Sequence, residues 1–191
     1  MIDPVKNLAY CLFDTPLGAI GLVWRHDQNS NFGPAVVYLQ LPEATRQMTE
    51  SRIARIGASK VTSSPPQIAE LIQRICRHLQ GQVQNFRDVL IDLDEVAPFE
   101  RQVYEAAREI PAGQTKTYGE IAKALNQPHA AQAVGQALGR NPVALLIPCH
   151  RVLAAGGKFG GFSAPGGRIT KTKLLVIEGA AVEPYLFSSS A

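Results

Sequence analysis

The chain has 191 residues, of which 46% are hydrophobic and 18% are charged, and its formal net charge is +3. This balance excludes a disordered chain, and the 16 glycines and 13 prolines are too few for a collagen-like or low-complexity one. No apolar run is long enough for a transmembrane helix, no signal-peptide pattern opens the chain, and three widely spaced cysteines argue against a disulfide framework, so we expect a cytoplasmic protein without membrane contact.

The first half of the chain is predicted to be a small sheet with helices. Three short apolar or β-branched runs, separated by turn-forming residues, predict a β-meander with strands at 8–13, 19–24 and 35–41. Residues 42–56 predict a helix with one exposed face, and residues 68–79 predict a more strongly amphipathic helix. Residues 88–93 predict a further strand, after which we place a domain boundary at residue 96.

The second half is predicted to be mainly helical. A helix is expected from Pro98 to Ile110. Thr117 and Glu120 have the spacing of a capping box, which predicts a short helix beginning there. Pro128 suits the first position of a second helix, which we expect to end at Gly139. The fold class is therefore α/β (α+β): an N-terminal α/β domain at 1–96 and a helical domain at 97–191 that contains a helix-turn-helix.

The helix-turn-helix coincides with a concentration of positive charge. Residues 1–96 carry nine Lys and Arg against ten Asp and Glu, whereas residues 97–191 carry ten against six. Between Pro111 and Lys173 there are eight basic residues and one acid. This pattern is typical of a face that binds a polyanion, but a merely solvated basic surface has the same composition. The small residues of the second helix likewise fit close packing either in the core or in a nucleic-acid groove.

Cys149 is the candidate nucleophile. It follows a run of apolar residues and Pro148, and it precedes His150 and Arg151. Basic neighbours stabilise a thiolate, which is the reactive form of cysteine. In an extended chain adjacent side chains point to opposite faces, so we expect Pro148 to place the cysteine in a turn and a water to carry any proton transfer. The alternative is a small buried cysteine that ends a core strand.

The residues around Cys149 resemble those of a known family. The run from Asn141 to Val152 has the form Asn-Pro-x-x-x-x-Ile-Pro-Cys-His-Arg-Val and directly follows the helix-turn-helix. In this it closely resembles the O6-alkylguanine-DNA alkyltransferases, also called methylated-DNA–protein-cysteine methyltransferases. The resemblance covers most of the second half, including 99–103, 117–120, 160–163 and 173–180. It implies a ribonuclease-H-like first domain and a winged helix-turn-helix-like second domain.

The family implies DNA repair by direct reversal. An alkylated guanine is flipped out of the duplex, and Cys149 takes the alkyl group from O6 in one irreversible turnover. His150 acts as a base through a water, Glu178 orients it, and Asn141 braces the turn that carries the cysteine. O4-alkylthymine is a second substrate that the resemblance leaves open. No cofactor or metal is implied, and the expected partner of a monomeric protein is double-stranded DNA that contains the alkylated base.

The resemblance also implies residues for substrate and DNA. The substrate-binding residues are Tyr118, Val152, Phe162 and Ser163. The DNA-binding residues are Thr117, Gly119, Ala131, Gln132, Arg140 and Arg151. Three residues depart from the family pattern: Gln132 stands in place of the arginine that fills the gap left by the flipped base, Phe162 in place of a tyrosine, and Ala144 in place of a proline.

Two alternatives accompany this interpretation. A helix-turn-helix protein that only senses damaged bases would share the basic face, but such relatives lack the cysteine. A thiol protease or thiol-disulfide enzyme needs neither the helix-turn-helix nor the basic face. A zinc site is disfavoured because the soft ligands of the first half include no Cys-x-x-Cys pair, so we expect core cysteines and surface histidines at Cys11, His26, Cys76 and His78.

Overall fold

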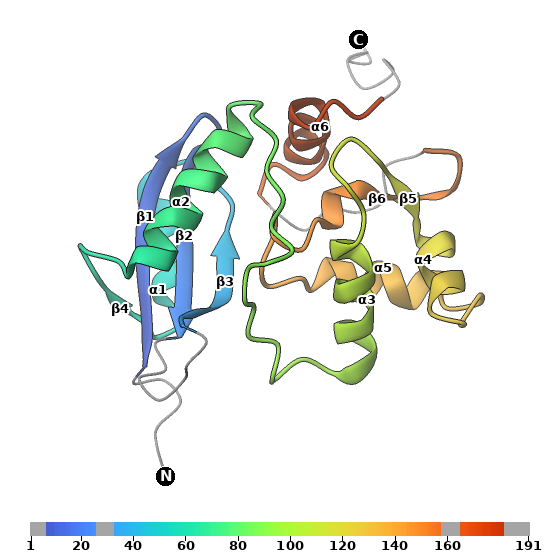
Figure 1. Cartoon of the computed structure of the whole chain (residues 1–191), viewed down its shortest axis with the longest axis horizontal. Helices are drawn as coiled ribbons and strands as arrows, with labels where there is room; N and C mark the ends of the chain where they lie inside the picture. The colour runs from blue at the N-terminus through green and yellow to red at the C-terminus, as the bar shows by residue number, and fades with distance from the viewer. Residues whose placement is uncertain (1–6, 26–32, 158–164, 182–191) are drawn as a thin grey trace.

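The computed structural model describes residues 7–25, 33–157 and 165–181. The N-terminal half is a four-stranded sheet in the order β3-β2-β1-β4, with two helices packed against it (Figure 1). The strands are β1 (Leu8–Thr15), β2 (Gly18–Arg25), β3 (Ala35–Gln40) and β4 (Ser59–Lys60), of which β4 pairs parallel to β1 and the others are antiparallel. The helices are α1 (Arg46–Ala54) and α2 (Pro66–Leu79). The predicted meander and amphipathic helix are confirmed.

Side-chain alternation along β2 explains why both faces of the sheet are covered. Ile20 and Leu22 belong to the core cluster that contains the apolar side of α2, whereas Val23 clusters with Ile53 of α1. Gly21 lies on the α1 face, where a Cβ atom would stand 2.2 Å from Ile53 Cδ1. A side chain at position 21 would therefore have to displace the end of the Ile53 side chain, which packs directly over Gly21.

One prediction for this half placed the start of a helix too early, and another was wrong. The helix expected at 42–56 begins only at Arg46, because Thr45 is its N-cap and accepts the backbone N–H of Met48 on its hydroxyl. Residues 88–93 do not form a strand, since in this segment only Ile91 makes a β-bridge, with Val36 of β3. The segment touches the edge of the sheet once and then crosses to the second half, so it is too short to form a ladder.

The C-terminal half is mainly helical, as predicted. Its helices are α3 (Pro98–Arg108), α4 (Tyr118–Ala124), α5 (Ala131–Gly139) and α6 (Gly167–Ile177), with two 3₁₀ turns, η1 (Cys149–Arg151) and η2 (Ala155–Gly157). The short strands β5 (Lys116–Thr117) and β6 (Val152–Leu153) pair in parallel. The predicted capping box at Thr117 and Glu120 is present at the start of α4.

The second helix of the helix-turn-helix begins later than predicted. Pro128 lies in the connecting turn, and α5 begins at Ala131. Asn126 takes a left-handed conformation with φ of 58°, and the N–H of Ala130 then donates to the carbonyl of Gln127 at 2.9 Å. Residues 126–130 therefore form the connection between the two helices, including the residues where the sequence pattern predicts the first turn of the second helix.

The two halves share one hydrophobic core. A single cluster of buried side chains includes residues of β2, β3 and α2 together with residues of α3, α4, α5 and the segment before Cys149. The backbone N–H of Leu39 in β3 also donates to the carbonyl of Pro142 at 3.0 Å. The edge strand of the sheet thus holds the segment that leads to the cysteine, while the domain boundary at residue 96 stays a prediction.

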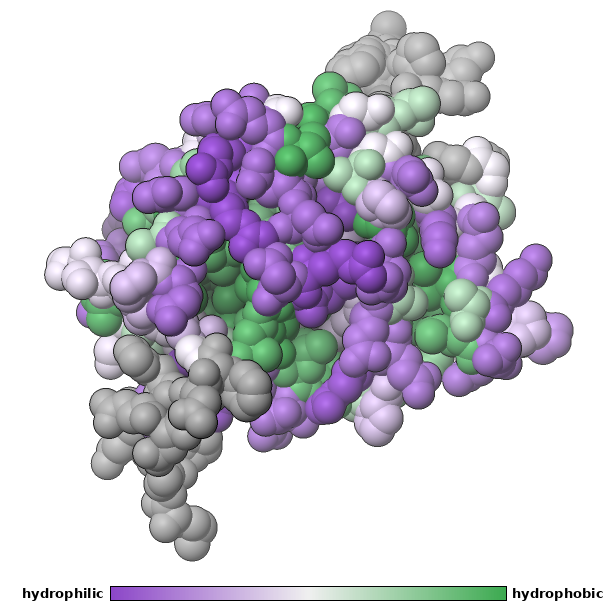
Figure 2. Space-filling model, viewed as in Figure 1, coloured by the Kyte–Doolittle hydropathy of each residue, from purple (hydrophilic) through white to green (hydrophobic). Residues whose placement is uncertain are grey.

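Polar and apolar side chains occupy different parts of the molecular surface. Hydrophilic side chains cover most of the face shown in Figure 2, and apolar surface gathers along part of the seam between the halves. None of the helices in the described part of the chain has the length and apolar composition that crossing a membrane requires.

The buried hydroxyl of Tyr104 offers a test of the core. It donates to the carbonyl of Ala137 at 3.0 Å and thereby joins α3 to α5. Tyr104→Phe should lower the free energy of unfolding by about 1 kcal/mol, because the hydrogen bond that joins α3 to α5 is lost, while the backbone N–H of Arg140 still donates to the Ala137 carbonyl. Urea denaturation should show a lower midpoint with an unchanged slope. Tyr38→Phe is the control, since that half-buried hydroxyl donates to the side chain of Gln40 within the same strand; an equal loss in both variants would contradict the prediction.

Candidate active site

The turn that carries Cys149 is built around Asn141. Its amide Nδ2 donates to the carbonyl of Ile147 at 2.8 Å and to Cys149 Sγ at 3.2 Å, and its Oδ1 accepts the N–H of Val143 at 2.9 Å. Inside this turn Leu145 is buried with φ of 74°, a strained conformation for a bulky residue. Strain of this kind persists only where surrounding contacts hold it, and Asn141 supplies three of them.

Cys149 is buried in the first position of η1, so the predicted turn after Pro148 is confirmed. Burial raises the pKa of its thiol, and the hydrogen bond from Asn141, the nearby ammonium of Lys171 and the backbone N–H groups of Cys149 and His150 offset this only in part. The resting group is therefore a thiol, and a nucleophile forms only when a base removes the proton.

The thiol faces a cavity of about 220 Å³. Its lining includes Asn141, Ala144 and Cys149 from the C-terminal half and Gln40 from β3. Space therefore exists beside the sulfur for a small group, and Ala144, one of the three departures from the family pattern, forms part of the wall.

His150 is buried in the protein interior and does not belong to the lining of this cavity. Its Nε2 lies 2.9 Å from Glu178 Oε1, and neither side chain has exposed surface. Burial lowers the pKa of His150, although Glu178 opposes this, so the imidazole is neutral. A neutral ring that donates from Nε2 has its lone pair on Nδ1, and within the described residues Nδ1 has no hydrogen-bond partner. His150 therefore has a free basic nitrogen.

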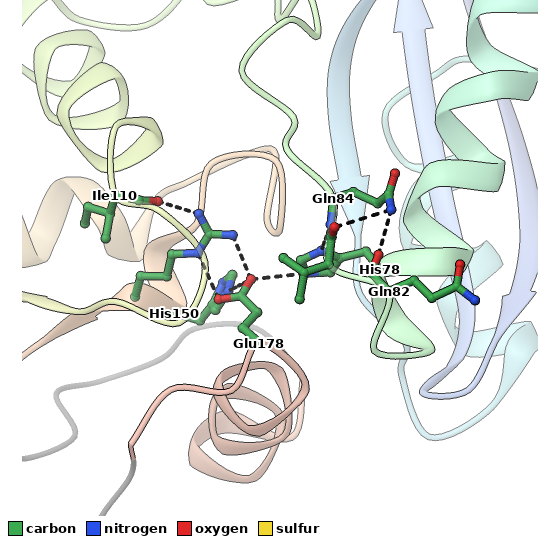
Figure 3. Close-up of polar contacts among 8 residues, drawn as sticks. His78, Gln82, Gln84, Ile110, His150 and Glu178 are labelled. Carbon is green, nitrogen blue, oxygen red and sulfur yellow. Dashed lines mark hydrogen bonds and ion pairs between the residues drawn. The ribbon is translucent and has the colours of Figure 1, made fainter.

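Glu178 is the centre of a buried polar cluster (Figure 3). Arg151 donates from Nε to Oε2 at 2.9 Å and from Nη2 to Oε1 at 2.7 Å, and His78 Nε2 lies 3.1 Å from Oε1. Burial alone would raise the pKa of Glu178, but the hydrogen bonds from His150, His78 and Arg151 outweigh it and hold the pKa far below its usual range. The carboxylate is therefore ionised at neutral pH.

The prediction that Arg151 contacts DNA was wrong. Its guanidinium is buried, grips Glu178 with two hydrogen bonds and donates a third to the carbonyl of Ile110. The physical reason is that a buried carboxylate needs a counter-charge, and the tight turn of η1 directs Arg151 inward to supply it.

Two buried polar residues were missed by sequence reasoning. His78 was expected at the surface but has no exposed side-chain area, and Lys171, counted in the basic face, is buried and donates from Nζ to the carbonyl of Val152 at 2.6 Å. Burial lowers the pKa of Lys171 to about 8. The burial of His78 could have been predicted from helical spacing, since His78 continues the apolar stripe of Leu71 and Ile75 along α2.

The remaining predicted residues have different surroundings. Gln132 is exposed at the start of α5, and Arg140 is exposed and paired with Glu100 at 2.8 Å. Tyr118 is half-buried near Gly135 of α5. Ala131 and Gly119 are half-buried, Thr117 uses its hydroxyl in the capping box, and Val152 is buried. Phe162, Ser163 and His26 lie outside the described residues.

No group of three or more metal-ligating side chains occurs within the described ranges. Cys11 and Cys76 are free and half-buried, with Cys11 packed against the core cluster, and burial raises the pKa of both thiols, that of Cys11 to about 11.

Fold and site together define a protein with a buried thiol beside a helix-turn-helix. A family model described as "6-O-methylguanine DNA methyltransferase, DNA binding domain" matches residues 98–180. A methylated-DNA–protein-cysteine methyltransferase of Mycolicibacterium paratuberculosis is 34% identical over 171 residues, which are 90% of this chain and 92% of that protein. The chain therefore belongs to the methylated-DNA–protein-cysteine methyltransferase family, whose members are DNA repair enzymes.

Solved structures agree with this assignment. The crystal structure of the Mycobacterium tuberculosis O6-methylguanine methyltransferase has a TM-score of 0.69 at 31% identity and covers 95% of this chain and 99% of its own. The structure of Mycobacterium tuberculosis OGT in complex with DNA has a TM-score of 0.68 at 31% identity and covers 90% and 92%. The predicted family, enzyme class and mixed α/β fold are confirmed.

The amide of Asn141 allows a test of the thiol's environment. Asn141→Asp replaces the Nδ2 donor by an acceptor, so it should raise the pKa of Cys149 further, because the thiolate loses a hydrogen bond and gains a negative neighbour. The protein is labelled with iodoacetamide at a series of pH values between 6 and 11, and labelling of Cys149 is measured by peptide mass spectrometry. The midpoint of the rise in labelling with pH should lie at a higher pH in the variant than in the wild type. Cys76 in the same samples is the control, and a midpoint that is unchanged or lower would contradict the prediction.

Proposed function

We propose that this protein repairs alkylated DNA by direct reversal, in a single irreversible turnover in which Cys149 accepts the alkyl group of O6-alkylguanine. The observation that carries the proposal is the buried pair of a protonated thiol, held by Asn141, and a neutral His150 whose Nδ1 has no partner among the described residues. A general base next to a thiol is the arrangement that nucleophilic catalysis by cysteine needs.

The chemical step follows from these protonation states. His150 Nδ1 takes the thiol proton through a water, and the thiolate of Cys149 attacks the alkyl carbon in line with the bond to O6. The sulfur–carbon bond forms as the carbon–oxygen bond breaks, and the guanine leaves as an anion that then takes up a proton. Donors near the base, for which the family implies Tyr118 and Ser163, stabilise that anion.

Glu178 has a positioning role in this proposal. It holds the proton of His150 on Nε2, so that the other nitrogen is the base, and it stabilises the imidazolium that forms when the base accepts a proton. Arg151 neutralises the carboxylate and keeps it in place. The acceptor is the protein's own thiol, so the reaction uses no cofactor and the thioether product ends the protein's activity.

The target base reaches Cys149 only after it has rotated out of the duplex, because O6 is inaccessible inside the base stack. We assign the DNA contacts to α4 and α5, with Gln132 near the gap that the base leaves. Among the other basic residues of the predicted face, Lys116, Lys123, Arg168 and Lys173 are exposed, which suits contacts to phosphates. We place the protein in the cytoplasm as a monomer that binds double-stranded DNA.

The stoichiometry of transfer tests the proposal directly. The protein is incubated with a duplex that contains one O6-methylguanine, then digested, and the Cys149 peptide is weighed. We expect the mass of one methyl group per protein in the wild type and none in Cys149→Ser, which should still bind the duplex. A parallel duplex with O4-methylthymine tests the second substrate. Binding without any gain of mass would instead indicate a sensor of damaged DNA.

Gln132 is expected to limit DNA binding or base flipping. An amide is uncharged and shorter than the arginine that the family pattern has at this position, so Gln132→Arg should tighten binding or speed methyl transfer several-fold. Gln136→Arg is the matched control, since it adds the same charge at an exposed position one turn further along α5. Equal effects of both variants would show that only the added charge matters.

A further inference from the structure

His78 connects the N-terminal half to the candidate active site. It lies near the end of α2, 100 residues before Glu178 in the sequence, and its Nε2 is 3.1 Å from Glu178 Oε1 (Figure 3). Neither side chain has exposed surface. The carboxylate that orients His150 is therefore also held from the other half of the chain.

The structure determines which nitrogen of His78 carries the proton. The backbone N–H of Gln84 donates to His78 Nδ1 at 3.1 Å. A nitrogen that accepts a hydrogen bond has no proton of its own, so the neutral ring is protonated on Nε2 and donates to Glu178. The edge-on contact with Phe86, with ring centroids 5.3 Å apart, fixes the plane of the imidazole.

This donor completes the set of contacts on Glu178 Oε1. Three groups converge on that one oxygen: His78 Nε2, His150 Nε2 and Arg151 Nη2. The final torsion of a glutamate side chain is soft, so the carboxylate plane is set by its hydrogen bonds rather than by rotamer preference. His78 is the one of these donors that comes from the N-terminal half, so without it the carboxylate is held from the side of η1 alone and its plane is less tightly set.

From these contacts we propose that His78 is a positioning residue for alkyl transfer, contributed by the N-terminal half. It aims Nδ1 of His150 at the thiol side by holding Glu178 in one orientation, and it touches neither Cys149 nor the substrate. This inference rests on the proposed function, because it assigns a role within that reaction. By this inference the N-terminal half contributes a side chain that supports the reaction, in addition to its contribution to the shared hydrophobic core.

Two substitutions of His78 distinguish a role in positioning Glu178 from a role in packing alone. In His78→Gln the amide nitrogen occupies the place of Nε2 and can donate to Glu178. In His78→Asn the polar atoms lie where Nδ1 was, so the side chain reaches Gln84 but not the carboxylate. A residue that matters only for packing or for its link to Gln84 would tolerate asparagine at least as well as glutamine.

The measurement is the single-turnover rate of methyl transfer from an O6-methylguanine duplex, with DNA affinity and thermal midpoint measured alongside. We expect His78→Asn to lower the rate at least about tenfold, as loss of a hydrogen bond to a charged group does, and His78→Gln to stay within about threefold of wild type. DNA affinity should be unchanged in both. Equal rates in the two variants, whether high or low, would overturn the inference.

A second measurement does not depend on how well the variants fold. In wild-type protein with ¹⁵N-labelled histidine, the side-chain nitrogens of His78 should show an unprotonated Nδ1 and a protonated Nε2, and the opposite tautomer would overturn the inference. If the wild type transfers methyl groups and His78→Asn does so at the same rate, only this inference fails. If the wild type binds the duplex and transfers nothing, the proposed function fails and this inference fails with it.

Discussion

The buried carboxylate of Glu178 is the constraint on which the rest of the site depends. An ionised carboxylate inside a protein is tolerated only when its oxygens are fully hydrogen-bonded and its charge is neutralised. Here it accepts from Arg151, His150 and His78, which come from η1 and α2, while Glu178 itself caps the end of α6. Satisfying one charge therefore brings three separate parts of the chain together around the turn that carries Cys149.

The same charge balance explains why a histidine can act as a base in this interior. Glu178 favours an extra proton on the imidazole of His150, and the guanidinium of Arg151 beside it opposes this. Burial then decides the outcome and lowers the pKa of His150, which leaves the ring neutral with a lone pair on Nδ1. Had the carboxylate lacked the arginine, its attraction would favour the imidazolium, which has no lone pair to offer the thiol.

Features encoded by neighbouring residues could be predicted from the sequence, and features that depend on distant contacts could not. The capping box of Thr117 and Glu120 is local, and so is the turn after Pro148. The inward direction of Arg151 and the burial of His78 depend on Glu178, which is far away in sequence, and composition assigned both residues to the surface. The strand expected at 88–93 failed for a related reason, since strand propensity does not show whether a partner strand is available along its whole length.

The burial that assembles the site also restrains its nucleophile. In the single-turnover reaction proposed above, an alkylated Cys149 is not regenerated, so reaction with an unrelated electrophile would inactivate the protein. Burial raises the pKa of Cys149 and keeps it as a thiol, while its base stands ready on the neighbouring residue. In the proposed reaction the thiol attacks the alkyl carbon only once His150 has taken its proton through a water. The resting thiol is consequently weakly nucleophilic, and in the proposed reaction the base that activates it is the imidazole that Glu178 already holds in place.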